Sequence, residues 1–187
     1  MSTVSIQKKN IQTKEDFLPL EGTDYVEFYV GNAKQAAHYY MSAFGFQALA
    51  YAGPETGMKD RASYVVRQHK LTFVLTTPLF PNNEMADHIY RHGDGVKALA
   101  LRVDDAVQAW QETLKRGAKN YLEPKALKDD GGEVVVSGIH TYGDTVHLFI
   151  ERKNYHGVFM PGYREWGNAY FKPMDTGLQY VDHCVGN

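Results

Sequence analysis

The sequence predicts an α+β fold made of two β-α-β-β-β modules. One observation is that segments with apolar residues at every second position flank single segments with helical apolar spacing. The other is that landmarks of the first half recur in the second: Val30 corresponds to Val103, and Gly45 corresponds to Gly117, separations of 73 and 72 residues. Two landmarks with nearly the same separation indicate an internal duplication.

The first predicted module covers residues 24–95. Its opening strand, DYVEFYV, places Val26, Phe28 and Val30 on one face, because alternate side chains of a strand share a face. Asn32 is a predicted helix cap, and Gly45 is predicted to end the helix. The apolar positions of that helix are Ala33, Ala36, Ala37, Tyr40 and Phe44, and the strands that follow are FQALAY, ASYVVRQ and KLTFVLTTPL.

The second predicted module covers residues 96–152. It opens with the strand VKALALRV, Asp104 is the predicted cap, and Gly117 is predicted to close the helix. Its apolar stripe is Ala106, Val107, Trp110 and Leu114, and its remaining strands lie in AKNYLEP, GEVVVSGIHTYG and TVHLFIERK. The two modules together form a predicted domain over residues 18–152.

Three further segments complete the predicted organisation. Residues 1–17 are polar and are predicted to form an arm or an extended lead-in. Residues 153–178 contain Pro161, Pro173 and six aromatic residues, so this linker is expected to pack against the domains it joins. Residues 179–187 are predicted to be the first strand of a third module that the chain begins and does not finish.

Composition excludes several classes of partner. The net charge is −2, with 20 basic and 22 acidic residues scattered along the chain, which argues against nucleic acid and anionic membranes. The apolar runs are too short to span a bilayer. A single cysteine, Cys184, allows no internal disulfide, and the polar N-terminus has no apolar signal core, so a cytoplasmic location is expected.

One histidine is informative because it lies in a segment that occurs twice in similar form. YVDHCVGN at 180–187 shares five of its eight residues with YVEFYVGN at 25–32, and the third position is acidic in both. The most informative difference is the fourth position, which is His183 in place of Phe28. On a strand, His183 shares its face with Val181 and Val185. A hydrogen-bonded structural histidine is the default interpretation, and a metal ligand is the alternative.

Other candidate residues form weaker patterns. His88 and His92 are four apart, a spacing that places both imidazoles on one side of a helix, but no third ligand is evident and a solvated helix end is favoured. His140 and His147 are interpreted as ordinary sheet residues. Cys184 has no C-x-x-C partner. The chain therefore contains no complete catalytic constellation.

The ordered combination of segments resembles a known family. Two β-α-β-β-β modules, HGDGVKALALRV at 92–103, the linker YHGVFMPGY at 155–163 and DHCVGN at 182–187 resemble bacterial 4-hydroxyphenylpyruvate dioxygenases of the vicinal oxygen chelate superfamily. The resemblance covers roughly residues 18–187. It implies a glyoxalase-like fold, in which mixed sheets curl into a pair of half-barrels.

The resemblance also implies a function. Family members convert 4-hydroxyphenylpyruvate and O2 to homogentisate and CO2 in tyrosine catabolism, and iron(II) is held by two histidines and a glutamate of the C-terminal domain. His183 falls on the first of these ligands, and the others would lie beyond Asn187. The chain alone is expected to bind no metal and to be inactive, and the full-length enzyme is expected to form homo-oligomers.

Three alternatives remain at this stage. A hydroxymandelate synthase starts from the same substrate, and a stand-alone module of the same fold can sequester small drug-like molecules. A metal-dependent lyase or isomerase of the superfamily is disfavoured, because the positions that would hold its metal are apolar: Phe28, Phe73, Ala98 and Leu148. A register slip of one residue would bring Thr72, His147 or Phe149 to these positions, and one histidine would still not make a site.

Overall fold

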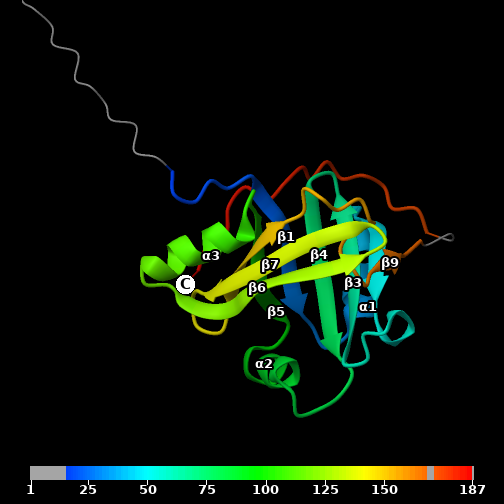
Figure 1. The fold of residues 1–187 in the computed structure, drawn as a ribbon. Helices are drawn as coiled ribbons and strands as arrows, with labels where there is room; N and C mark the ends of the chain where they lie inside the picture. Colours follow the sequence, from blue (N-terminus) through cyan, green and yellow to red (C-terminus); the bar gives the residue numbers. More distant parts are fainter. Residues whose placement is uncertain (1–15, 168–170, 187) are drawn as a thin grey trace, which may run out of the picture.

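The fold is an α+β arrangement of one curved sheet with helices on its outer side (Figure 1). It is seen in a computed structural model that describes residues 16–167 and 171–186. The predicted arm, residues 1–17, lies outside the described residues except for its last two, of which Phe17 stacks on the Arg116 guanidinium 3.6 Å from the ring centroid. Within the described residues, no helix is long and apolar enough to cross a membrane.

The two modules have the same strand connectivity. The first consists of β1 (Gly22–Tyr29), α1 (Ala33–Phe44), β2 (Gln47–Ala52), β3 (Arg61–Gln68) and β4 (Leu71–Pro78). The second consists of β5 (Gly95–Arg102), α3 (Ala106–Lys115), β6 (Lys119–Asp129), β7 (Gly132–His140) and β8 (Val146–Glu151). In each, the first strand pairs in parallel with the last strand, and the others follow antiparallel.

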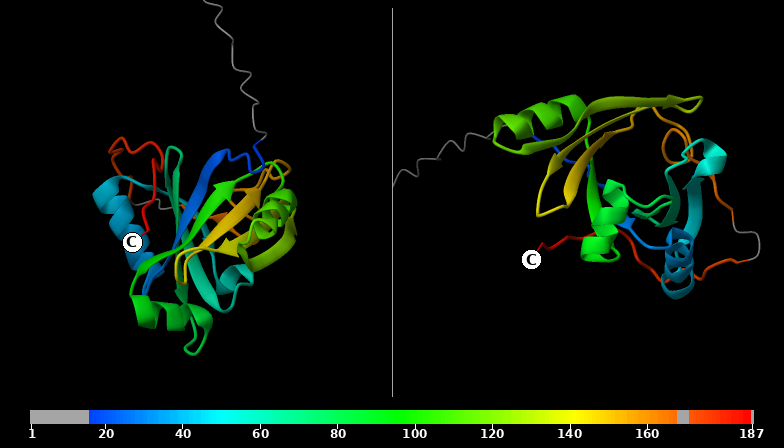
Figure 2. Two further views of the ribbon diagram at one scale, coloured as in Figure 1. Left: turned by 90° about the vertical axis from the view of Figure 1, so that its left-hand side faces the viewer. Right: turned by 90° about the horizontal axis from the view of Figure 1, so that it is seen from below.

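A single ladder joins the modules. β1 pairs antiparallel with β5, which gives one nine-stranded sheet. Its order is β6-β7-β8-β5-β1-β4-β3-β2-β9, where β9 is the short strand Arg164–Glu165. Figure 2 shows this sheet curving around an interior, with α1 and α3 on its outside. The mixed, curled sheet confirms the predicted fold class.

The helix ends follow capping chemistry. The Asn32 side chain accepts from the Gln35 backbone N–H at 3.0 Å, and Gly45 ends α1 with a left-handed φ of +74°, both as predicted. The cap of α3 is Asp105, which accepts from Gln108 N–H at 2.8 Å, so the prediction of Asp104 was wrong by one residue. Two adjacent aspartates offer the same capping chemistry, and only the backbone direction chooses between them.

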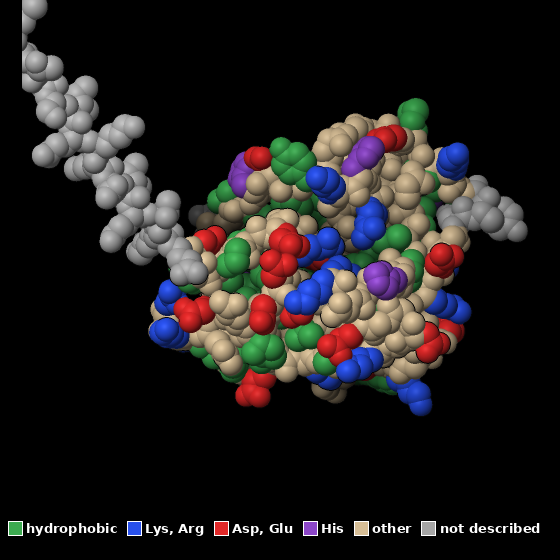
Figure 3. Space-filling model, turned by 45° about the horizontal axis from the view of Figure 1, so that its top comes forward, with side chains coloured by type: hydrophobic (Ala, Val, Ile, Leu, Met, Phe, Trp, Pro, Cys, Tyr) green, Lys and Arg blue, Asp and Glu red, His purple; other side chains and the backbone are tan. Residues whose placement is uncertain are grey.

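A third helix, α2 (Glu84–His92), crosses between the modules, and Asn83 caps it by accepting from Ala86 N–H at 2.8 Å. A 3-10 turn, Pro54–Thr56, follows β2. Acidic and basic side chains are interspersed over the face drawn in Figure 3.

The aromatic linker packs on the domain as predicted. Tyr155, Phe159 and Met160 are buried in the apolar cluster that fills the interior between the modules. A short strand, β9 (Arg164–Glu165), then pairs with β2, and the Trp166 ring contacts Tyr64 edge-on, 4.8 Å between centroids. The aromatic content of this segment is therefore used in the core and along the sheet edge.

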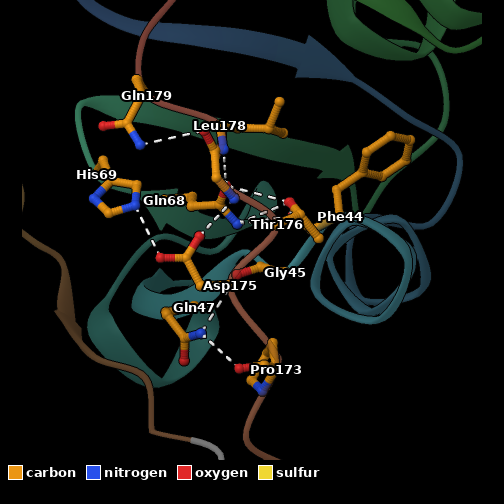
Figure 4. Close-up of polar contacts among 11 residues, drawn as sticks. Phe44, Gly45, Gln47, Gln68, His69, Pro173, Asp175, Thr176, Leu178 and Gln179 are labelled. Atoms are coloured by element: carbon orange, nitrogen blue, oxygen red, sulfur yellow. Dashed lines mark hydrogen bonds and ion pairs between the residues drawn. The ribbon is translucent and has the colours of Figure 1, made fainter.

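Residues 173–179 lie along the first module (Figure 4). The described part of the predicted third-module strand, residues 179–186, forms no strand. The buried Gln68 amide donates to the Phe44 carbonyl at 2.8 Å and accepts from Leu178 N–H at 2.6 Å. Lys70 N–H donates to the Gln179 carbonyl at 2.9 Å. The missing strand has a simple reason: within the described chain, no strand runs beside residues 180–186 to complete a ladder.

Candidate functional site

The interior between the two modules is the first candidate site, and β1 supplies its centre. Tyr25 lies in the apolar cluster shared by both modules, together with Val74 of β4 and Ala98 of β5. Phe28 instead packs in the cluster beneath α1. Because strand side chains alternate, Glu27 shares the interior face with Tyr25. The odd-numbered residues of β1 therefore face the interior.

This face opens on a cavity of about 740 Å³. Tyr25 and Glu27 line it from β1, Val74 from β4, Arg61 from the start of β3, and Tyr163 from the linker. The linker thus closes one side of the space that the modules enclose.

Glu27 is the acidic group that β1 contributes to this cavity. Its Oε1 accepts from the Thr76 hydroxyl at 2.8 Å, and Thr76 in turn lies 2.9 Å from the buried Ser63 hydroxyl, so Ser63 can donate to Thr76. The side chain borders the cavity, but surrounding protein atoms remove most of its water. This desolvation raises the pKa of Glu27, and the Thr76 hydrogen bond, Arg61 and Lys97 oppose it only in part.

Replacing Glu27 with glutamine should make the stability of the protein less sensitive to pH. A carboxyl whose pKa is raised by folding holds extra protons in the folded state, so its contribution to stability falls as the pH rises from its unfolded pKa through its folded pKa. Glu27→Gln removes this loss and keeps an acceptor for Thr76. The urea midpoint of the variant should exceed that of wild type at pH 8, and the gain should shrink toward pH 4. An unchanged difference across this pH range would show that Glu27 carries no such penalty.

Tyrosines supply the donors of the interior. Burial, and then the neighbouring Glu27, raise the pKa values of Tyr25, Tyr29 and Tyr163, so these phenols stay protonated at neutral pH. A protonated phenol is a poor metal ligand and a good hydrogen-bond donor. The interior is thus suited to holding a small polar molecule, or to packing alone, and not to binding a metal.

The four apolar residues at the positions where a superfamily metal would be held do not share one face of the sheet. Phe28 and Phe73 contact each other at 5.0 Å between ring centroids on the helix side, whereas Ala98 and Leu148 face the interior. The match of His183 to Phe28 therefore pairs His183 with a residue that points away from the interior. Shifting the register by three residues aligns Asp182–His183 with Asp24–Tyr25, and this places the counterpart of His183 inside.

The remaining histidines divide by environment. His140 is the last residue of β7 and lies beside Tyr121, with ring centroids 5.2 Å apart. His147 is half-buried on the outer face of β8, its Nδ1 has no hydrogen-bond partner within the described residues, and burial lowers its pKa. His88 and His92 lie on α2, and the structure places Asp144 beside them as a third metal-ligating group, which the sequence did not indicate.

His183 itself is an exposed residue, with 75% of its side chain accessible. Its Nδ1 lies 2.8 Å from Asp182 Oδ2. With the proton on Nδ1, the ring donates to this carboxylate, and the Nε2 lone pair is left free to bind a metal. Among the residues that the structure describes, no group of three metal-ligating side chains includes His183. The described chain could therefore contribute one iron(II) ligand, His183, together with Asp182 as the hydrogen-bond acceptor that orients its ring. Cys184 is an exposed free thiol.

Comparison with known proteins identifies relatives over most of the chain. Residues 15–160 match the family model described as hydroxyphenylpyruvate dioxygenase, HPPD, N-terminal. A 4-hydroxyphenylpyruvate dioxygenase of Aspergillus fumigatus is 42% identical over 89% of this chain and 46% of its own length. One from Coccidioides posadasii is 43% identical over 92% of this chain and 47% of its own length. The chain thus spans about half the length of these curated relatives.

Solved structures agree on the fold. A 4-hydroxymandelate synthase variant from Streptomyces coelicolor superimposes with a TM-score of 0.71 and 27% identity, covering 87% of this chain and 45% of its own. A methylmalonyl-CoA epimerase gives a TM-score of 0.58 at 20% identity, over 75% of this chain and 100% of its own. The second likeness shows the fold alone.

Proposed function

The chain belongs to the family of hydroxyphenylpyruvate dioxygenase N-terminal domains, and from this premise we propose that it is the non-catalytic half of an iron(II)-dependent 4-hydroxyphenylpyruvate dioxygenase. The observation that carries the proposal is the match of residues 15–160 to this family model. The curated relatives are about twice as long as this chain. The proposed reaction converts 4-hydroxyphenylpyruvate and O2 to homogentisate and CO2. A cytoplasmic location and a homo-oligomeric state stay predictions.

The proposed division of the chain gives each part a role. Residues 18–152 would form a supporting domain, 153–178 a linker, and 179–187 the start of the catalytic domain. Two contacts support this role for the linker. Arg152, held by Asp24, donates to the Phe159 carbonyl, which fixes the beginning of the linker. Gln68 holds Thr176 and Leu178 near its end. The segment that leads to His183 is therefore anchored on the first module.

Iron(II) held by two histidines and a carboxylate would supply open positions for the 2-oxo acid and for O2. The contribution of this chain would be His183 as a neutral imidazole ligand, with Asp182 accepting from Nδ1 and fixing the ring. The second histidine and the glutamate would come from residues after Asn187. The domain interior, with protonated tyrosines and a cavity around Glu27, has no step in this reaction.

The likeness to the Streptomyces coelicolor 4-hydroxymandelate synthase, with a TM-score of 0.71, favours a second candidate, hydroxylation of the side chain of the same substrate. The reading frame of the source gene beyond the codon for Asn187 tests both. We expect it to continue for about as many residues again, with a further histidine and a glutamate on strands, and we expect the encoded protein to release homogentisate.

Product analysis then separates the candidates. Chromatography with authentic standards distinguishes homogentisate from 4-hydroxymandelate, and a denatured sample is the control for spontaneous oxidation. Release of 4-hydroxymandelate would replace the proposed activity with the second candidate. A stop codon directly after Asn187 would contradict both, and it would direct attention to the Glu27 cavity as a binding site for small molecules.

A further inference from the structure

A cluster of three metal-ligating side chains lies outside the Glu27 cavity, at a second cavity that Cys184 of the C-terminal segment also lines. His88 and His92 come from α2, and Asp144 comes from the turn between β7 and β8. One potential ligand atom of each lies within 4.8 Å of the others. His92 Nε2 is already 2.9 Å from Asp144 Oδ2, and the two imidazole centroids are 4.6 Å apart.

The surrounding structure holds these three side chains close together. The spacing of four residues places both imidazoles on one side of α2. Lys97 Nζ donates to the Asp144 backbone carbonyl at 2.8 Å and so holds the turn against β5. His88 is only 3% exposed and packs edge-on against the Tyr29 ring, 5.4 Å between centroids.

We propose that His88, His92 and Asp144 form a binding site for a divalent transition-metal ion of the zinc class. Two imidazoles and one carboxylate are a ligand set that zinc, cobalt and nickel accept. All three residues line a cavity of about 670 Å³, from which water can fill the remaining coordination positions. This site does not depend on the proposed dioxygenase activity.

The geometry requires a small adjustment. Ligand atoms about 2.0–2.1 Å from a tetrahedral zinc ion lie about 3.3 Å from one another. All separations in the cluster are within 4.8 Å, so one or two side chains must move by up to about 1.5 Å. His92 and Asp144 are both partly exposed at the surface and can supply this movement. The buried His88 would be the fixed ligand.

One cation competes with the metal. Arg91 Nη1 lies 2.8 Å from Asp144 Oδ2, the same oxygen that His92 contacts, and this arginine is 54% exposed. Metal binding must therefore displace the guanidinium into solvent, and Arg91 should weaken the site. Arg91→Ala is therefore expected to strengthen metal binding, a result that a general loss of folding cannot produce.

The test is calorimetric titration of the metal-free chain with Zn²⁺, with Co²⁺ absorption as a second readout of coordination. We expect one ion per chain. Asp144→Asn and His92→Ala should each weaken binding by about 10-fold or more, and Arg91→Ala should strengthen it by a few-fold. The matched control is His69→Ala, since His69 and Asp175 form a similar exposed pair at 2.9 Å without a third ligand. His183→Ala is the control for zinc binding at Asp182 and His183.

Three results would overturn the proposal. The first is the absence of saturable Zn²⁺ binding by the wild-type chain up to about 1 mM. The second is unchanged binding in both Asp144→Asn and His92→Ala. The third is a loss of binding that appears in His183→Ala instead. Thermal melting of each metal-free variant shows whether it is folded.

Discussion

The Asp24→Ala variant is expected to lose about 3–5 kcal/mol of unfolding free energy, the typical cost of removing one partner from a buried ion pair. The Asp24 side chain is 2% exposed. It accepts from Arg102 at 2.8 Å and from Arg152 at 2.5 Å, and Arg152 is itself 14% exposed. Without Asp24, the Arg152 guanidinium is left buried beside β1 with no carboxylate.

Urea denaturation followed by circular dichroism measures this loss. The matched control is Asp60→Ala, because Asp60 forms an exposed pair with Arg61 at 2.7 Å, and exposed pairs contribute about 1 kcal/mol or less. A second expected effect is local: the start of the linker, which Arg152 holds through the Phe159 carbonyl, should become more accessible to proteases. Equal midpoints for the two variants would show that the Asp24 cluster does not carry the predicted stability.

A second large effect is expected at His183 in a protein that also contains the catalytic half. His183→Ala should lower iron-dependent turnover by more than about 100-fold, since residues that only orient metal ligands already contribute 10- to 100-fold. The loss of turnover in Asp182→Asn should be about 10- to 100-fold. The amide oxygen still accepts a hydrogen bond from Nδ1–H, but it is a weaker acceptor than the carboxylate.

Cys184→Ser is the control for this pair, since Cys184 is an adjacent exposed residue with no assigned role. Iron content after dialysis separates loss of the metal from loss of folding. Full turnover by His183→Ala would exclude His183 as a ligand and would remove the residue-level support for the proposed function.

The two modules could be predicted from the sequence because the patterns that define them are local. Alternation of apolar residues, the Asn32 cap and the left-handed Gly45 are properties of neighbouring residues, and the repeat at 73 residues showed that the pattern occurs twice. The β1–β5 ladder that unites the modules in one sheet is long-range, and so is the pairing of β9 with β2. Neither leaves a pattern in a short window of sequence.

The candidate sites show the same limit. Matching letters aligned His183 with Phe28, but the faces of β1 show that Tyr25 and Glu27 are the interior residues. Glu27 was missed because a lone glutamate on an alternating strand looks like a solvent-facing residue. The spacing of His88 and His92 was visible, but Asp144 is 52 residues from His92, and only the folded turn between β7 and β8 brings it within 2.9 Å.

The central claim is that these 187 residues support a catalytic half and do not themselves catalyse the reaction. The most direct test is oxygen uptake in the presence of 4-hydroxyphenylpyruvate and Fe(II), measured for the purified chain and for the protein encoded by the uninterrupted source gene. We expect uptake that depends on iron and substrate for the full protein, and none above the metal-only blank for the 187-residue chain. Iron-dependent turnover by the 187-residue chain alone would contradict it.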